Sequence, residues 1–397
     1  MPRYEERKWR ADLGAFGGRK SRTSFTYRAY VPDPVADLDV TLSSEIAEVI
    51  GEADRATVLL NHTPPAVDNL EALARQLLRA ESVASSRIEG LVMSHRRLAR
   101  AAFAPEHARD VTAESILGNI RAMEHAIALG SRAEGLSVED LSAIHRVLLG
   151  STRDAHLGGA IREVQNWIGG ASDGPRDAEF IPPPPELVTG LLDDLCSFLT
   201  RDDLPPVVQA AIAHAQFETI HPFADGNGRV GRCLIHVVLI RRGLAARYVP
   251  PVSLVLAGNS RAYIAGLGEY RAGRIAEWCG TFAAAARTAA QGAGAFAEKI
   301  ADLQRRWMGA AGNPRRGSTA LQVISALPAH PILDVKTAET IAHTSNQAAR
   351  LAMIQLEEAG VLKRINVGKR NRAWEAVGLF DLLNAFERDL GSRRRST

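Results

Sequence analysis

The sequence predicts a mostly α-helical protein with one β-hairpin in its central part and a separate C-terminal unit. From residue 43 onward, apolar residues recur at spacings of three and four, which is the period of an amphipathic helix. Short β-type runs lie on both sides of Asp173-Gly174-Pro175, and such runs around a turn-forming segment predict a hairpin. Residues 309–317 combine glycine, proline and arginine, so we expect a linker there, followed by the C-terminal unit.

Helices are expected to fill most of the chain before this linker. Residues 1–40 show little periodicity and are expected to wrap around the rest as an arm. Gly90 and Gly243 are expected to close two of the helices, because glycine readily adopts the left-handed conformation that ends a helix. The segments predicted as helical are 43–59, 70–89, 115–129, 138–149, 187–199, 206–220, 229–242 and a series between 257 and 307.

Composition indicates an ordinary soluble globular protein. The 397 residues are 46% hydrophobic and 23% charged, and a chain of this length is expected to form about two or three domains. The formal net charge is only +3, so no global electrostatic field favours nucleic acid. The three cysteines, Cys196, Cys233 and Cys279, form no CxxC pair. This argues against a zinc ribbon or a disulfide framework and fits a reducing compartment.

The sequence also bears on the cellular location. The N-terminus, MPRYEERKWR, has no apolar core of a signal peptide. No stretch approaches the roughly 20 apolar residues needed to cross a membrane. A cytoplasmic protein is therefore expected.

The most informative segment runs from His221 to Arg232, between two predicted helices. Gly226 and Gly228 let backbone N–H groups approach an anion closely. The helix that follows adds unpaired N–H groups and the positive end of its dipole. Arg229 and Arg232 are three residues apart on that helix, so both project toward the same side. The segment therefore predicts a site for a phosphate-bearing ligand.

Two further side chains of this segment suit chemistry on a nucleotide. Asp225 offers a hard carboxylate oxygen, and Mg²⁺ is commonly bound by one or two carboxylates together with substrate phosphates. His221 titrates near neutral pH and can accept a proton from an attacking hydroxyl group. Together these groups suit a nucleotide polyphosphate that is attacked by an alcohol.

This segment resembles the signature of the Fic family, H-x-F-x-(D/E)-G-N-G-R-x-x-R, and fills every fixed position of it. The resemblance implies a helical bundle with a hairpin flap that transfers AMP from ATP, with Mg²⁺, onto Ser, Thr or Tyr hydroxyl groups of target proteins and of itself. It also implies attack at the α-phosphorus, with pyrophosphate as the leaving group. The implied roles are general base for His221, loop anchor for Phe223, Mg²⁺ ligand for Asp225, anion hole for Gly226, Asn227 and Gly228, and phosphate binding for Arg229 and Arg232.

Other sites that share parts of this segment find no support in the rest of the sequence. Glu218 and His221 form an E-x-x-H, as in di-iron carboxylate bundles, but no second copy occurs. An H-E-x-x-H zinc motif and the G-x-x-x-x-G-K-[ST] phosphate loop are both absent. His214 and His236 are expected to be helix residues rather than ligands.

A second motif precedes the first along the chain. Ser85-Ser86-Arg87-Ile88-Glu89-Gly90 matches the inhibitory pattern of the Fic family, (S/T)-x-x-x-E-(G/N). The resemblance implies that Ser85 and Glu89 form an inhibitory site in which Glu89 pairs with Arg232. A carboxylate can satisfy a guanidinium with two hydrogen bonds, and this would keep ATP out of its productive pose. The alternative is that this segment is only a solvated helix end, without an inhibitory role.

The predicted hairpin, residues 165–181, corresponds in position to the flap of the Fic family. The resemblance implies an edge strand that aligns the target segment through main-chain hydrogen bonds. Ile168 is our candidate for an apolar clamp beside the modified residue. Alternatively, Trp167 and Ile168 pack in the core.

The C-terminal unit resembles a winged helix. Two of its helices are expected to be separated by a tight turn at His343-Thr344-Ser345, and Gly360 is expected to close the last one. A basic tip is expected between the two strands of its hairpin. The helices are predicted at 319–327, 337–342 and 346–359, the strands at 361–365 and 372–376, and the tip at 367–371.

The winged-helix resemblance raises DNA as a partner. In such a complex the start of the third helix would face the major groove, and the basic tip would touch phosphates. Alternatively, the C-terminal unit is a protein-interaction module, because function does not follow from fold. The candidate DNA contacts are Asn346, Gln347 and Arg350 for the groove, and Lys369, Arg370 and Arg372 for phosphate.

Several hypotheses follow for the whole chain. The first is an adenylyltransferase inhibited by Glu89. The second is a DNA-binding regulator whose Fic core senses nucleotide, and the third is an enzyme in which Glu89 positions water to remove AMP. Two further points stay open: the chain could use another nucleotide in place of ATP, and it could form a homodimer. The predicted divisions are an N-terminal helical region at 1–110, a Fic core at 111–290, a linker helix and loop at 291–317, and the winged helix at 318–397.

Overall fold

The structure is a computed structural model that describes residues 2–10, 23–62, 70–104, 109–132, 135–170, 174–367 and 371–392. Within these ranges the protein is mostly helical with small antiparallel sheets, as the sequence predicts. The chain divides into two compact units, each built from separate segments. The first unit comprises residues 1–50, 125–242 and 264–283, and the second comprises 51–124, 243–263 and 284–397.

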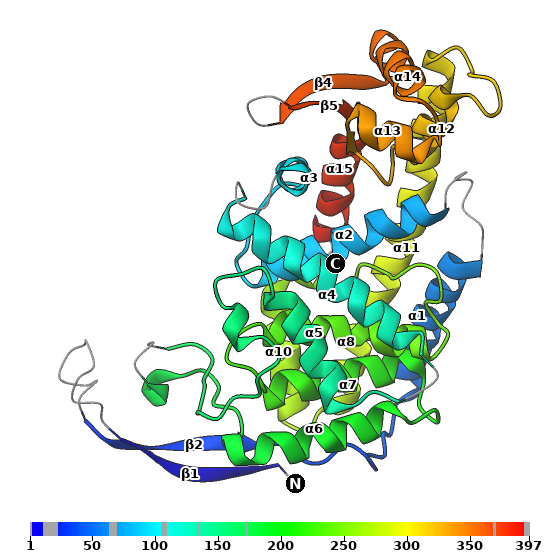
Figure 1. The fold of residues 1–397 in the computed structure, drawn as a ribbon. Helices are drawn as coiled ribbons and strands as arrows, with labels where there is room; N and C mark the ends of the chain where they lie inside the picture. Colours follow the sequence, from blue (N-terminus) through cyan, green and yellow to red (C-terminus); the bar gives the residue numbers. More distant parts are fainter. Residues whose placement is uncertain are drawn as a thin grey trace. The chain divides into compact units, whose positions relative to one another are not determined.

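Packed helices form the core of the first unit. α7 is central, since every residue from Val207 to Ile220 is buried, and its sequence accordingly has no polar face. α8 approaches α7 closely at Gly231, where a Cβ atom would lie 2.9 Å from Glu218 Oε1. The neighbouring helices in Figure 1 are α5 (Val138–Leu149), α6 (Pro185–Leu199), α7 (Pro206–Ile220) and α8 (Asn227–Arg241).

The N-terminal arm contains strands that sequence analysis did not predict. β1 (Arg3–Trp9) pairs antiparallel with β2 (Phe25–Val31), in a register that places Arg3 opposite Val31 and Trp9 opposite Phe25. Trp9 contacts Phe25 and Tyr27, with ring centroids 6.5 and 6.4 Å apart. Such cross-strand aromatic pairs stabilise a sheet, so these aromatic residues were the overlooked signal.

The predicted flap hairpin was wrong as a pair of strands. Among the described residues of this segment, 165–170 and 174–181, one antiparallel bridge joins Ile168 to Phe180. The chain between them includes the short 3₁₀ helix η4 (Pro175–Asp177). Gly169 and Gly170 both have positive φ, 72° and 74°, and such residues interrupt an extended strand.

Several helices pass from one unit to the other along the chain. Among the described residues, no helix is both long enough and apolar enough to cross a membrane. α11 runs without a break through the predicted boundary at 290/291, and the predicted domain boundaries stay predictions. The helices with residues in both units are α1 (Ser44–His62), α4 (Val111–Gly130), α10 (Ser260–Arg271) and α11 (Ile275–Ala310).

The second unit is built around α2, which packs against α9 (Val252–Gly258). α2 (Leu70–Ile88) is followed by Gly90 at φ 79°, the predicted left-handed end of the helix. α3 (His95–Phe103) was not anticipated. It begins at Ser94, whose side chain accepts the Arg97 N–H, an N-cap of the usual kind.

The C-terminal part of this unit contains the helices and strands predicted for the winged helix, and adds strand β3 and helix α15. The strands are antiparallel, in the order β3-β5-β4. Assignment to the winged-helix fold itself stays a prediction. The elements are α12 (Thr319–Ala326), β3 (Ile332–Leu333), α13 (Val335–Ile341), α14 (Asn346–Glu358), β4 (Leu362–Val367), β5 (Asn371–Ala376) and α15 (Leu379–Ser392).

Candidate active site

The loop between α7 and α8 holds the predicted motif, and its backbone is set at two positions. His221 ends α7 in the left-handed conformation, with φ 52° and ψ 59°, and its N–H donates to the Phe217 carbonyl at 2.9 Å. Gly226 precedes α8 with φ 78°. A Cβ atom at Gly226 would lie 2.9 Å from Leu148 Cδ2. Both the backbone conformation and the available space therefore favour glycine at 226.

Asn227 braces this loop from within. Its Oδ1 accepts the Phe223 N–H at 2.8 Å, and its Nδ2 donates to the Phe223 carbonyl at 2.8 Å. Phe223 is fully buried and stacks on His145, with ring centroids 3.9 Å apart. Because both ends of the Asn227 side chain are engaged, its backbone N–H is the group that can meet a phosphate.

Arg162 holds the C-terminal end of α7. Its Nε donates to the His221 carbonyl at 2.8 Å, and its Nη2 donates to the carbonyls of Pro183 and Ile220 at 2.6 and 3.3 Å. Burial lowers the pKa of Arg162 to about 10, so the guanidinium stays charged at neutral pH. A cation is favourable at this end of a helix, where carbonyl groups lack helical partners.

Asn166 supports the same loop from the flap segment. Its Nδ2 donates to the carbonyls of His221 and Phe223 at 3.3 and 3.1 Å. Ile161, which precedes the flap segment, forms an antiparallel bridge with Phe223. The backbone around His221 is therefore fixed by contacts from a segment distant in sequence.

His145 fixes the loop on the α5 side. Its Nδ1 accepts the Gly159 N–H at 3.0 Å, and its Nε2 lies 3.0 Å from the Asp225 carbonyl. Since Nδ1 accepts, the proton is assigned to Nε2, which donates to Asp225. Burial lowers the pKa of His145 to about 4, so the ring is neutral at neutral pH.

Folding stability is expected to fall as the pH decreases from about 6.5 to about 4, in part because of His145. In this window the unfolded chain has taken up the proton and the folded protein has not, so protons favour unfolding. Urea unfolding at about pH 7 and about pH 5 measures the loss. His145→Gln should lose less stability between these two pH values than the unsubstituted chain, and an equal loss would contradict this role for His145.

Two buried arginines lie at the start of α8. Arg229 Nη2 is 3.2 Å from Asp225 Oδ2, and its side chain is 5% exposed against 62% for Asp225. Arg232 is 1% exposed. Burial, and after it the charge of Arg232, lowers the pKa of His214 to about 3. Together with the N–H groups of the first helical turn, these cations make the start of α8 favourable for an anion.

Asp225 suits a metal ion that takes most of its ligands from water and substrate rather than from the protein. The described residues contain no group of three or more His, Cys, Asp or Glu side chains that could hold a metal ion. The Asp225 carboxylate is largely exposed. One such carboxylate suits Mg²⁺, which usually keeps several waters and binds substrate phosphates.

Ile168 lies in the flap segment on the single bridge. Its N–H donates to the Phe180 carbonyl at 2.8 Å, and its carbonyl accepts the Glu179 N–H at 2.8 Å. Trp167 packs against Trp9 of β1, with ring centroids 5.4 Å apart. Trp167 therefore contacts the arm, while the role of Ile168 as a clamp stays a prediction.

The inhibitory sequence belongs to the second unit. Ser85 is fully buried near the end of α2. Glu89 follows the helix on an exposed turn. Glu89 and Arg232 belong to different units, and their pairing stays a prediction.

The candidate DNA contacts lie in the C-terminal part of the second unit, and DNA binding stays a prediction. Asn346 donates from Nδ2 to Glu339 Oε2 at 3.0 Å. Lys369 and Arg370 lie outside the described residues. The exposed candidates are Asn346, Gln347 and Arg350 on α14 and Arg372 on β5.

Sequence analysis missed the residues that hold the loop from other elements, namely His145, Arg162 and Asn166. Each was a polar residue within or beside an apolar run. Arg162, for example, directly follows Ile161 in a segment that otherwise suggests a strand. A polar residue in such a setting usually has a buried partner, but the sequence does not say which one.

Comparison with known proteins identifies two matching families. The Fic/DOC family model matches residues 135–239, and the model of the Fic/DOC family N-terminal region matches residues 47–128. The first match contains α5, α6, α7, most of α8 and the loop described above. The second contains the Ser85–Glu89 sequence.

Curated relatives agree with these matches over part of their length. The chain is 32% identical over 150 residues to protein adenylyltransferase fic-1 of Caenorhabditis elegans, which is 36% of this chain and 27% of that protein. It is 30% identical over 246 residues to protein adenylyltransferase Fic of Culex quinquefasciatus, which is 57% of this chain and 46% of that protein. The chain thus spans less than half the length of these two relatives.

Solved structures support the fold. A Fic family protein from Desulfovibrio desulfuricans G20 aligns over 85% of this chain and 98% of its own, with a TM-score of 0.53 and 20% identity. Fic-1 from C. elegans, residues 134–508, aligns over 63% of this chain and 72% of its own, with a TM-score of 0.50 and 21% identity. The two adjacent family matches lead to one conclusion: the chain contains a Fic/DOC domain at residues 135–239, preceded by the N-terminal region of the same family at residues 47–128.

Proposed function

We propose that this chain is a protein adenylyltransferase that transfers AMP from ATP to Ser, Thr or Tyr hydroxyl groups of target proteins and of itself. The observation that carries the proposal is the α7–α8 loop, in which Arg162 donates to the His221 carbonyl and Asn227, the first residue of α8, donates to the Phe223 carbonyl. The names of the curated relatives, which are protein adenylyltransferases, support the same activity.

In the proposed reaction a target hydroxyl oxygen attacks the α-phosphorus of ATP. A bond forms between these two atoms, and the bond from the α-phosphorus to the oxygen shared with the β-phosphate breaks, so that pyrophosphate leaves. His221 takes the hydroxyl proton on its imidazole. The N–H groups at the start of α8, with Arg229 and Arg232, stabilise negative charge on the phosphates.

Mg²⁺ is the metal ion that we assign to this reaction, with Asp225 as its protein ligand. When bound with ATP, it would supply charge neutralisation on the phosphates. The Asp225 carboxylate would then exchange its contact with Arg229 Nη2, now at 3.2 Å, for the metal. Arg229 would be released to bind phosphate.

The target segment is proposed to lie along the flap, next to Ile168. The main-chain N–H and carbonyl of Ile168 are both hydrogen-bonded to residues 179 and 180. Along an extended chain, successive residues direct their main-chain hydrogen bonds to opposite sides. The hydrogen bonds to the target would therefore come from the residues next to Ile168. The side chain of Ile168 would hold the modified residue in place. We further propose a cytoplasmic location, consistent with the three free and buried cysteines.

The activity is tested by incubating the purified chain with ATP and Mg²⁺ and analysing it by mass spectrometry. The expected product is a peptide of this chain that carries one AMP group on Ser, Thr or Tyr. Absence of AMP on the chain, and on proteins of an added cell lysate, would count against the proposal. The Glu89→Gly chain should be used beside the unsubstituted one, so that inhibition does not mask the activity.

Glu89→Gly is expected to raise AMP incorporation by about tenfold or more, the equivalent of about 1.4 kcal/mol. The proposed reason is that Glu89 occupies Arg232, and its removal frees this arginine for the outer phosphates. The substitution lies outside α2 on an exposed turn, so stability should change by no more than about 0.5 kcal/mol. Incorporation of label from ATP, measured at equal protein concentration, provides the comparison.

Unchanged incorporation in Glu89→Gly would remove the inhibitory role. The alternative role of Glu89, positioning water to remove AMP, makes a different prediction. In that case the unsubstituted chain releases AMP from a target labelled beforehand, and Glu89→Gly does not.

A further inference from the structure

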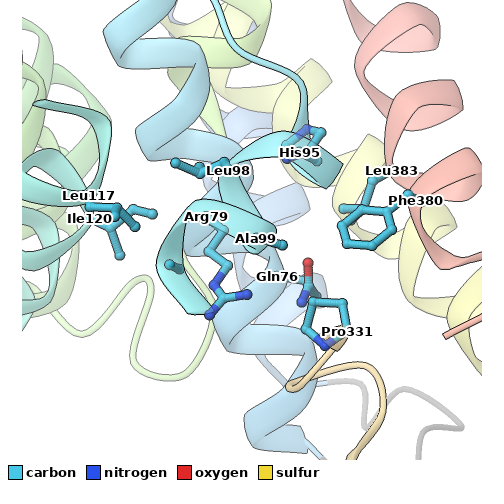
Figure 2. Close-up of a pocket in the computed structure, with 11 residues that line it drawn as sticks. Gln76, Arg79, His95, Leu98, Ala99, Leu117, Ile120, Pro331, Phe380 and Leu383 are labelled. Carbon is cyan, nitrogen blue, oxygen red and sulfur yellow. The ribbon is translucent and has the colours of Figure 1, made fainter. Parts of the chain in front are cut away.

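A pocket of about 70 Å³ lies within the second unit, away from the α7–α8 loop. Its walls come from α2, α3, α4 and α15 and from Pro331, which precedes β3. Figure 2 shows Leu117 and Ile120 of α4 on one side and Phe380 and Leu383 of α15 on the other. The lining is therefore mainly aliphatic and aromatic, as in most small-molecule sites.

Two of the three long polar side chains that line this pocket have partners. His95 Nε2 lies 2.9 Å from Glu387 Oε1. Gln76 donates from Nε2 to the Pro328 carbonyl. These groups are accounted for by contacts within the protein, so they need no ligand.

Arg79 is the exception among these three. Its side chain extends from α2 toward the pocket (Figure 2), and no described residue accepts a hydrogen bond from it or pairs with it as an ion. Burial, and after it the charge of Arg75, lowers the pKa of Arg79, while Glu124 acts more weakly in the opposite direction. Arg79 is partly buried, and a cation withdrawn from water without a close anion is unfavourable, so an anion in this pocket would be stabilised.

Two further basic residues, Arg75 and His330, interact electrostatically with Arg79. His330 is affected by the same cations, since burial and then Arg75 and Arg79 lower its pKa. Arg75 differs from Arg79 because it is exposed and pairs with Glu71 at 2.7 Å. Among the described residues that line this apolar pocket, Arg79 is thus the cation that lacks a described partner.

We propose that this pocket binds a short aliphatic monocarboxylate. Its carboxylate pairs with the Arg79 guanidinium through two parallel hydrogen bonds, and its hydrocarbon tail contacts Leu98, Phe380 and Leu383. The volume sets the length of the tail: the pocket has about 70 Å³, roughly half of the 150 Å³ cavity that accepts benzene in another protein. A tail of about three carbon atoms suits this space, so butyrate is the probe.

The test is calorimetric titration of the full chain with sodium butyrate, against sodium chloride at the same ionic strength. Saturable binding with a Kd of roughly 1 mM or tighter is expected. Butyramide, which has nearly the same shape and no charge, should bind at least tenfold more weakly, because a hydrogen bond to a charged group contributes more than a neutral one. Absence of saturable butyrate binding at concentrations up to about ten times this Kd would overturn the proposal.

Matched variants locate the site. Arg79→Gln should weaken butyrate binding about tenfold or more, whereas Arg75→Gln, which removes the neighbouring exposed arginine, should leave it within about twofold. Ala99→Leu should also abolish binding, because it fills the pocket without changing charge. Thermal unfolding measures whether each variant is folded. If either Arg79→Gln or Ala99→Leu does not fold, the binding result of the other variant tests the proposal. Equal affinity in a folded Arg79→Gln or Ala99→Leu chain, or equal binding of inorganic phosphate and butyrate, would overturn the proposal.

Discussion

Replacing His221 is expected to lower the rate of AMP transfer by about 10²–10⁴-fold, the usual contribution of a general base. His221 occupies the left-handed region at φ 52°, where asparagine is tolerated much better than alanine. His221→Asn is therefore the sharper variant, since it removes the imidazole while keeping the backbone conformation. His221→Ala should lose the same activity and, in addition, about 1–2 kcal/mol of stability.

These two variants separate chemistry from folding. Transfer rates and urea unfolding curves should be measured on the same protein samples, in the Glu89→Gly background so that the starting rate is high. A His221→Asn chain that is folded and transfers AMP at an undiminished rate would show that another group accepts the proton.

Replacing Arg162 by methionine is expected to destabilise the protein by about 3 kcal/mol or more. Arg162 is 5% exposed, and its side chain donates to the carbonyls of His221, Ile220 and Pro183. Each buried carbonyl left without a donor costs about 1–3 kcal/mol. Methionine keeps much of the apolar contact area and removes the donors, so the loss reports on the hydrogen bonds.

The same substitution should also reduce AMP transfer in protein that remains folded. The His221 carbonyl loses its bond to Arg162 Nε at 2.8 Å, and the residue that accepts the proton is then held less firmly. A displacement of about 1 Å at a reacting group can cost about 10²-fold in rate.

Arg132→Met provides the matched control for Arg162→Met. Arg132 is also in the first unit, but its side chain is 56% exposed and pairs with Asp140 at 3.3 Å. Exposed ion pairs contribute about 0–1 kcal/mol, so both stability and transfer should change little. If urea unfolding gives the same loss for both variants, Arg162 does not hold the loop in the way described.

The α7–α8 loop could be predicted from sequence because its residues are consecutive. The spacing from His221 to Arg232 places a helix end, a glycine turn and a new helix in order, and local rules of helix termination suffice for that. The structure has this arrangement, with α8 beginning at Asn227, two residues before the predicted start. The helical segments on both sides were predictable for the same reason, because their period is local.

The supporting residues could not be predicted, because their contacts connect distant positions. Arg162 and His221 are 59 positions apart, and His145 and Asp225 are 80 apart. No periodicity in a single sequence reports such a pair. The prediction of two paired strands in the flap was wrong for a different reason. Its turn-forming residues were recognised, but Gly169 and Gly170 have positive φ, and a single bridge is found in place of paired strands.

The central claim is that the start of α8 holds the triphosphate with its α-phosphorus next to His221. The most direct test compares two samples of ATP, labelled at the α- or the γ-phosphorus, with the Glu89→Gly chain and Mg²⁺. We predict label on protein from α-labelled ATP alone, and none from either sample with Glu89→Gly/His221→Asn. Label from γ-labelled ATP, or equal labelling by the double variant, would contradict the claim.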